Sequence, residues 1–212
     1  MRRLAACALL WVAACSRSGT SPPADFSILQ DLLDRLQRTS GEGVHGPYHP
    51  ANNALQKDLW ARLQNLPPGP GAGRILLEAA EKVYTRYDEN YYHGILWHWP
   101  YLCGRRAIEL CDRALKSTTD PEIRERALWI KAFAFRCPPM EPWGDAERDL
   151  ETYAEQRQWT PDFDAAREIY RALAAQFPEG RYGAAADRLA QQADLSVVLP
   201  KGPKARDPRE PR

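Results

Sequence analysis

The chain has 212 residues, of which 44% are apolar and 27% charged, and its formal net charge is +1. This length and composition are enough for one domain core, so folding needs neither a disulfide framework nor a metal. The balanced charge, without a basic run interleaved with aromatic residues, argues against a dedicated nucleic-acid-binding protein.

The first fifteen residues have the layout of an export signal. Arg2 and Arg3 precede a short apolar run, which ends in the small residues before Cys15. This run is much shorter than the roughly twenty residues of a spanning helix. The segment resembles a bacterial lipoprotein signal, which implies that residues 1–15 are the signal, that Cys15 carries diacylglycerol and fatty acid such as palmitate, and that Ser16 directs the protein to the outer membrane. An ordinary secretory signal with an incidental Cys15 is the alternative.

Composition divides the remaining chain into three parts. Residues 16–24 are rich in Ser, Gly and Pro and predict a flexible tether. Residues 25–199 carry the helical patterns of one domain, in which 25–66 could form a small N-terminal unit before the Pro- and Gly-rich break at 67–71. Residues 200–212 hold five basic and two acidic residues with several prolines, and predict a disordered basic tail.

Apolar residues recur at spacings of three and four along most of the domain, which predicts helices rather than strands. The expected helices span residues 26–36, 51–66, 74–87, 100–116, 121–136 and 143–153, with two more within 160–195 on either side of Pro178. Asp120-Pro121 and Thr160-Pro161 each resemble a capping residue followed by proline in the first turn. No alternating strand pattern occurs, so the expected fold class is all-α.

An aromatic stretch stands out between two of these helices. It contains Tyr91, Tyr92, Trp97, Trp99 and Tyr101. Large aromatic residues are usually buried, so one interpretation is a wall of the core. The other is an exposed patch that binds a partner protein, and it is the strongest candidate for such a patch in the chain.

The later helices suggest internal repetition. When the sequence is aligned with itself at a shift of 58 residues, Ala107, Ala114, Leu115 and Ala127 fall on Ala165, Ala172, Leu173 and Ala185. This repetition predicts stacked helical hairpins. This region resembles the tetratricopeptide-like repeats of outer-membrane β-barrel-assembly lipoproteins, through Ala166, Tyr170, Leu173, Phe177, Pro178, Tyr182 and Ala185. The resemblance covers about residues 105–193 and implies a degenerate helical-repeat array. Upstream the period is not kept, so an irregular bundle is the alternative.

Three of the five cysteines lie in the body of the chain: Cys103, Cys111 and Cys137. In an oxidising compartment a disulfide can form between two of them. If helices 100–116 and 121–136 fold back on each other, Cys103 comes close to Cys137. Cys111 is roughly 12 Å along the axis from Cys103, too far for a bridge. The expected pair is therefore Cys103–Cys137, with Cys111 buried and reduced.

Signatures of metal binding and catalysis are missing from the sequence. His45 and His49 are four residues apart, a spacing that can bind a metal on a helix, but they lie among Gly and Pro; His93 and His98 are five residues apart, which is not a helical ligand spacing. No phosphate-binding loop or nucleophile motif occurs. We therefore expect no metal, no cofactor and no enzyme.

These features together predict a lipid-anchored envelope protein whose helical repeats form a scaffold for protein–protein interaction, in envelope assembly or secretion. The membrane, through the lipid, and an unidentified envelope protein are the expected partners. An alternative from another class is a lipoprotein hydrolase or ligand carrier that acts on cell-wall or lipid material and uses His98, Tyr92 and Glu109. A passive envelope spacer is a third possibility.

Overall fold

The computed structural model describes residues 24–41, 53–69, 71–85, 104–136 and 158–195. Within these ranges the chain forms seven α-helices and one π-helical turn, and contains no strand, which confirms the all-α class. No helix in these ranges has both the length and the apolar character that a membrane crossing requires.

The N-terminal hairpin consists of α1 (Ala24–Gly41) and α2 (Asn53–Gln64). Its buried face is almost entirely leucine, contributed by Leu29, Leu32, Leu33, Leu36, Leu59 and Leu63. The chain then turns through a Pro- and Gly-rich segment. Gly71 there has a φ of 92°, a left-handed conformation that a residue with a Cβ rarely adopts.

The next helix changes its hydrogen-bonding pattern partway along. It runs as α3 (Ala72–Ala79) and continues as the π-helical turn η2 (Ala80–Tyr84). The Thr85 N–H donates to the Ala80 carbonyl at 2.8 Å, and the Thr85 hydroxyl donates to the same oxygen at 3.0 Å. The wider turn adds one residue to the helix, and Glu81 and Tyr84 within it are both buried.

Two antiparallel helices occupy the middle of the molecule, α4 (Gly104–Ser117) and α5 (Pro121–Arg136). The Asp120 carboxylate accepts from the N–H groups of Glu122 and Ile123 at 2.9 and 3.4 Å. Because Pro121 lacks an N–H and suits the first helical position, the predicted start of this helix is confirmed.

The last two helices are α8 (Phe163–Gln176) and α9 (Gly183–Gln191). Asp162, rather than Thr160, caps α8 by accepting from the Ala165 N–H at 2.9 Å, so the predicted cap was wrong by two residues. Pro178 lies in the turn after α8 and ends that helix as predicted. The second of the two helices expected within 160–195 ends earlier than predicted, because α9 stops at Gln191 and Ala193 beyond it is exposed.

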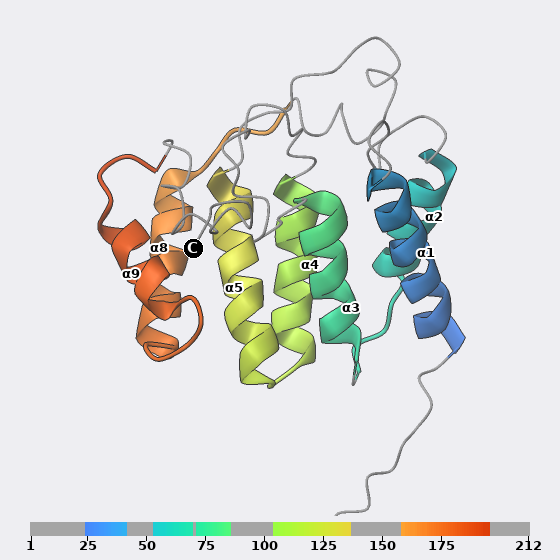
Figure 1. Cartoon of the computed structure of the whole chain (residues 1–212), viewed down its shortest axis with the longest axis horizontal. Helices are drawn as coiled ribbons and strands as arrows, with labels where there is room; N and C mark the ends of the chain where they lie inside the picture. Colours follow the sequence, from blue (N-terminus) through green and yellow to red (C-terminus); the bar gives the residue numbers. More distant parts are fainter. Residues whose placement is uncertain (1–23, 42–52, 70, 86–103, 137–157, 196–212) are drawn as a thin grey trace, which may run out of the picture.

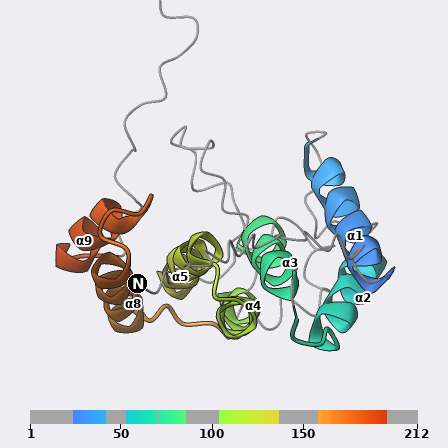
Figure 2. The ribbon, with the colours of Figure 1, turned by 90° about the horizontal axis from the view of Figure 1, so that it is seen from below.

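The helices form a row in which α1 contacts both α2 and α3, and from α3 onward each helix contacts the next. Figure 1 shows α1 and α2 at one end, α3, α4 and α5 in the middle, and α8 and α9 at the other end. In the perpendicular view of Figure 2, α1, α3, α5 and α9 lie along one side of the row. Helices α2, α4 and α8 lie along the opposite side. The buried side chains of all these helices join into one continuous core.

The second half of the row has a positional regularity. A shift of 59 residues carries the bounds of α4, Gly104 and Ser117, onto those of α8, Phe163 and Gln176. The same shift superposes buried residues: Ala107 on Ala166, Cys111 on Tyr170, Ala114 on Leu173, Ala127 on Ala186 and Ile130 on Leu189. The shift of 58 predicted from residue identity places all three of these buried alanines, Ala107, Ala114 and Ala127, on positions that are only half-buried.

Candidate interaction surface

The surface of the described part of the chain is polar. Ile28 on α1, 41% exposed, is the one large hydrophobic residue there that is classed as exposed. Apolar docking surfaces on soluble proteins usually span several hundred Å². Apart from Ile28, the large apolar side chains of the described helices are therefore buried or only partly exposed.

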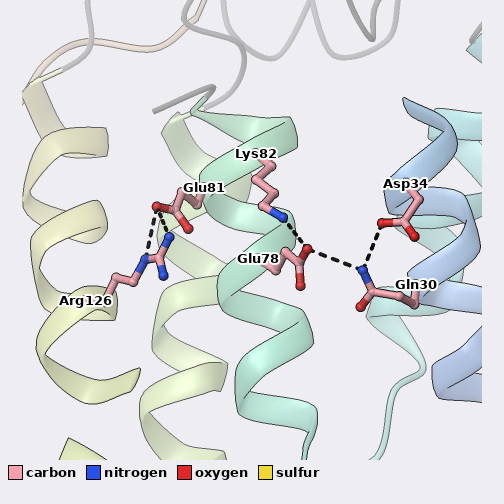
Figure 3. A network of polar contacts seen from close by, with 6 residues as sticks. All are labelled: Gln30, Asp34, Glu78, Glu81, Lys82 and Arg126. Carbon is pink, nitrogen blue, oxygen red and sulfur yellow. Dashed lines mark hydrogen bonds and ion pairs between the residues drawn. The ribbon is translucent and has the colours of Figure 1, made fainter. Parts of the chain in front are cut away.

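A polar network crosses the side of the row formed by α1, α3 and α5 (Figure 3). On α1, the amide nitrogen of Gln30 donates to Asp34 at 3.0 Å and to Glu78 of α3 at 3.3 Å. Glu78 also accepts from the Lys82 ammonium group, one turn later. These bonds connect two helices on the same side of the row, and the Lys82 ammonium group offsets one of the two carboxylate charges.

The network continues to α5 through a second ion pair. The Glu81 carboxylate in η2, whose side chain is 5% exposed, accepts from Nε and Nη2 of Arg126 at 3.0 and 2.6 Å. A buried carboxylate is costly unless it is paired, so Arg126 compensates the burial that the π-helical turn imposes on Glu81. The pair fixes η2 against α5 and has the role of a structural contact.

Another buried carboxylate holds the turn between α8 and α9. Glu125 on α5 accepts from the Tyr182 N–H at 2.7 Å. A Cβ on Gly180 would lie 2.2 Å from a Glu125 oxygen, so glycine is required where the turn passes the carboxylate. Trp129, one turn farther along α5, stacks on the Tyr182 ring with centroids 4.8 Å apart. Side chains of α5 therefore position the start of α9.

Two neighbouring clefts lie where the end of the described chain crosses α8. The first has a volume of about 700 Å³, lies between α8 and α9, and is lined by Arg167, Arg171, Asp187, Ala190, Gln191, Gln192 and Ala193. The second, of about 530 Å³, is lined by residues 160–164 together with Arg167, Ala193, Asp194 and Leu195. Arg167 and Ala193 belong to both clefts, so residues 192–195 run between them.

Cys111 lies inside the molecule as a free, fully buried thiol, as predicted. Burial raises its pKa above the ordinary value, and the negative charge of Asp112 adds to this effect. The thiol therefore stays protonated and unreactive in the folded protein. Cys103, Cys137 and Cys15 lie outside the described residues, so the disulfide and the lipidation stay predictions.

Most of the other predicted site residues also lie outside the described ranges. These are the aromatic residues Tyr91, Tyr92, Trp97, Trp99 and Tyr101 and all four histidines. Glu109, the predicted carboxylate of the alternative hydrolase, is described: it accepts from Gln64 at 2.8 Å and thereby connects α4 with the end of α2. Among the described residues no group of His, Cys, Asp or Glu could hold a metal ion.

Sequence reasoning missed the buried charged residues Glu81, Glu125 and Arg136. Their partners come from other helices, or from the chain after α9, so no local pattern marks them. Comparisons with known proteins add no assignment: no family model, curated protein or solved structure matches the chain.

Proposed function

We propose that this chain is a lipid-anchored protein of the cell envelope whose helical body binds another protein. The proposal is carried by the combination of a short apolar leader ending at Cys15 and an all-α body that begins only nine residues later, at Ala24. Each methylene buried in a bilayer contributes about 0.8 kcal/mol, so two or three acyl chains at Cys15 give stable anchoring. Ser16 favours the outer membrane, with the body on the periplasmic side.

We further propose that the body is a degenerate tetratricopeptide-like array. The shift of 59 residues that relates α4 to α8 supports this proposal, because it superposes both helix bounds and buried positions. Stacked hairpins of this kind present extended surfaces to protein partners. One end of the row supports a short array. Helix α9 there exposes Ala184, Asp187, Arg188 and Gln191, and a mainly polar outer face suits a terminal helix.

The aromatic stretch is the proposed partner contact. The described helices expose almost no large hydrophobic side chain, whereas Trp97 and Trp99 are of the type that dominates protein interfaces. Envelope assembly and secretion are the proposed settings, since both require proteins that hold others at a membrane.

Lipidation is tested by feeding cells an alkyne-labelled fatty acid and fractionating their membranes. The wild-type protein should incorporate the label and sediment with membranes, and Cys15→Ser should abolish both. Cys7→Ser is the matched control, because Cys7 lies in the proposed signal and should not matter. Unchanged sedimentation of the Cys15→Ser protein would contradict the anchor.

The partner contact is tested with Trp97→Ala and Trp99→Ala in cells treated with a membrane-permeable crosslinker. Each variant should lose a specific crosslinked species while its helical circular dichroism stays at the wild-type level. Ile28→Ala, which removes an exposed apolar residue on α1, is the control and should keep the species. A loss of helical signal in the tryptophan variants would instead assign the aromatic stretch to the core.

A further inference from the structure

The helices of the row are joined by short turns at one end of their axes and by long connections at the other. The short turns join α2 to α3, α4 to α5 and α8 to α9, and they consist of residues 65–71, 118–120 and 177–182. The long connections join α1 to α2, η2 to α4 and α5 to α8, and they consist of residues 42–52, 85–103 and 137–162. We name the two ends the short-turn end and the long-connection end.

Contacts between neighbouring elements bring the short turns together at one end. A Cβ on Gly73, in the first turn of α3, would lie 3.0 Å from the side chain of Thr118, which lies between α4 and α5. Glu125, near the start of α5, accepts from the N–H of Tyr182, which directly precedes α9. The short-turn end is the lower end of the row in Figure 1.

Helix α1 also begins at the short-turn end. Gln30 and Glu78, which are hydrogen-bonded, are each the seventh residue of their helix, α1 and α3. In Figure 3, Asp34 lies beyond Gln30 in the direction in which Lys82 lies beyond Glu78, so the two helices run in parallel. Since α3 starts at the short-turn end, Ala24 at the start of α1 lies there too.

The aromatic stretch is attached to the opposite end. It leaves the described row at Thr85, after η2, and re-enters it at Gly104, the first residue of α4. A Cβ on Gly104 would lie 2.9 Å from the carbonyl oxygen of Ala134, near the end of α5, and 3.0 Å from the ring of Trp159, which precedes α8. Both attachment points of the aromatic stretch therefore lie at the long-connection end.

The proposed lipid is close to the other end in sequence. Residues 16–24 connect Cys15 with the start of α1. A Ser-, Gly- and Pro-rich chain of this length has an end-to-end distance on the order of 15–18 Å. Helix α4, with 14 residues, is about 21 Å long. The connection to the lipid is thus shorter than the helices, and it holds the short-turn end nearer to the bilayer.

Charge does not add to this effect. Among the described residues of the short turns and the adjoining turn of each helix, the exposed side chains without an ion pair named above balance: Arg74, Lys116 and Arg181 are basic, and Asp120, Glu122 and Glu179 are acidic. Arg62, also exposed, is paired with Asp58 at 2.9 Å. The length of the connection to Cys15, and not attraction to anionic lipid, therefore sets which end faces the bilayer.

We propose that the anchored body holds its short-turn end toward the bilayer and its long-connection end away from it. Tryptophan and tyrosine gather both at protein interfaces and at membrane–water interfaces, so the composition of the aromatic stretch suits either. Its attachment points lie a helix length from the anchored end. The partner of the aromatic stretch is therefore a protein surface in the aqueous compartment, and not lipid. This inference rests on the proposed function, because it requires the lipid at Cys15.

The test measures energy transfer from a site-specific donor to an acceptor dye on lipid. The lipidated full-length protein is reconstituted in phosphatidylcholine vesicles that contain the dye. An azide-bearing amino acid replaces either Thr119, at the short-turn end of α4, or Arg105, at its long-connection end, and carries the donor. Both positions are exposed. Transfer should be at least twofold more efficient from position 119 than from position 105.

A second pair tests the same order at the far end of the row. Glu179 lies in the turn after α8 and Asp164 in its first turn, and both are exposed. Transfer should again be at least twofold more efficient from position 179 than from position 164, and added phosphatidylglycerol should not change either ratio. Equal efficiencies within either pair would overturn the proposal. The reverse order would overturn it as well and would assign the aromatic stretch to the bilayer interface.

The fate of the vesicles separates this inference from the function on which it rests. The wild-type protein should float with the vesicles, and Cys15→Ser should remain behind and show no transfer from any position. A wild-type protein that does not float would overturn the anchor and the orientation together. A protein that floats but gives equal transfer within a pair would overturn the orientation alone and leave the anchor standing.

Discussion

The two ends of the helical row are packed with residues of different size. Around α1 and α2 the core is leucine, whereas α4, α5, α8 and α9 meet through buried alanines and the rings of Trp129, Tyr170 and Tyr182. The alanine-rich helices contact one another over more of their length than α1 contacts α2 or α3. Small side chains allow helix axes to approach, and long ones hold them apart, so residue size separates a closely packed stack from a looser hairpin.

The polar contacts of the two ends also differ. The hairpin is joined to α3 by the half-buried residues Gln30 and Glu78, while the stack uses the buried groups Glu125 and Arg136. Exposed polar contacts contribute little to stability, but a buried group that loses its partner is costly. The comparison therefore predicts that damage to the stack unfolds the whole body, whereas damage to the hairpin stays local.

The largest expected effect follows from a cavity in the leucine core. Leu33 on α1 is fully buried, so Leu33→Ala should destabilise the hairpin by about 2–5 kcal/mol. Hydrogen exchange should then accelerate in residues 24–41 and 53–64 and stay unchanged in α5 and α8. Ile28→Ala on the same helix, where the side chain is exposed, should cost far less. Acceleration throughout the chain would show that the hairpin and the stack are one cooperative unit.

A substitution in the opposite direction tests the stack. Ala127 on α5 is fully buried, and Ala127→Leu inserts three carbon atoms, which should cost about 1–3 kcal/mol. The thermal unfolding midpoint of the whole protein should fall. Ala175→Leu, an equivalent change at an exposed position of α8, is the control and should leave the midpoint unchanged. If both variants behave alike, the alanines do not set the packing of the stack.

Much of this architecture could be predicted from the sequence, and the reasons are local. The predicted helix at 121–136 has the bounds of α5 because Asp120 and Pro121 fix its start. The shift that relates α4 to α8 was predicted as 58 residues, one fewer than the 59 residues in the structure. The prediction matched residue identities, because the sequence does not show which residues are buried. The π-helical turn at 80–84 and the non-helical segment 192–195 were missed, and the second of these is held by Arg136, which lies far away in the chain.

The next prediction concerns the pH dependence of stability at the centre of the stack. The pKa of the Cys111 thiol is raised by burial, whereas in the unfolded chain it is about 8.5. Above that pH the unfolded state loses a proton that the folded state retains, so stability should fall by about 1.4 kcal/mol per pH unit. Denaturant unfolding at pH 8 and 10 should show a smaller loss in Cys111→Ala than in the wild type. Equal losses in the two proteins would place Cys111 in contact with solvent.

The smallest expected effect is at the surface of the hairpin. Gln30→Ala removes the bonds to Asp34 and Glu78 and should cost about 0.5–1 kcal/mol at most. Chemical denaturation measures the change. Gln64→Ala is the matched control, because it is the same truncation and removes one hydrogen bond, to Glu109, at the opposite side of the row. A loss above about 2 kcal/mol in Gln30→Ala would mean that the polar network, rather than leucine packing, attaches α1 to the row.

Native-state hydrogen exchange of the full-length wild-type protein tests the central structural claim most directly. The slowest amides of α4, α5 and α8 should open only with global unfolding, and those of α1 and α2 should open at a lower free energy, with a smaller dependence on denaturant. One common opening free energy for all these helices, with one common denaturant dependence, would contradict the division into a closely packed stack and a separately attached hairpin.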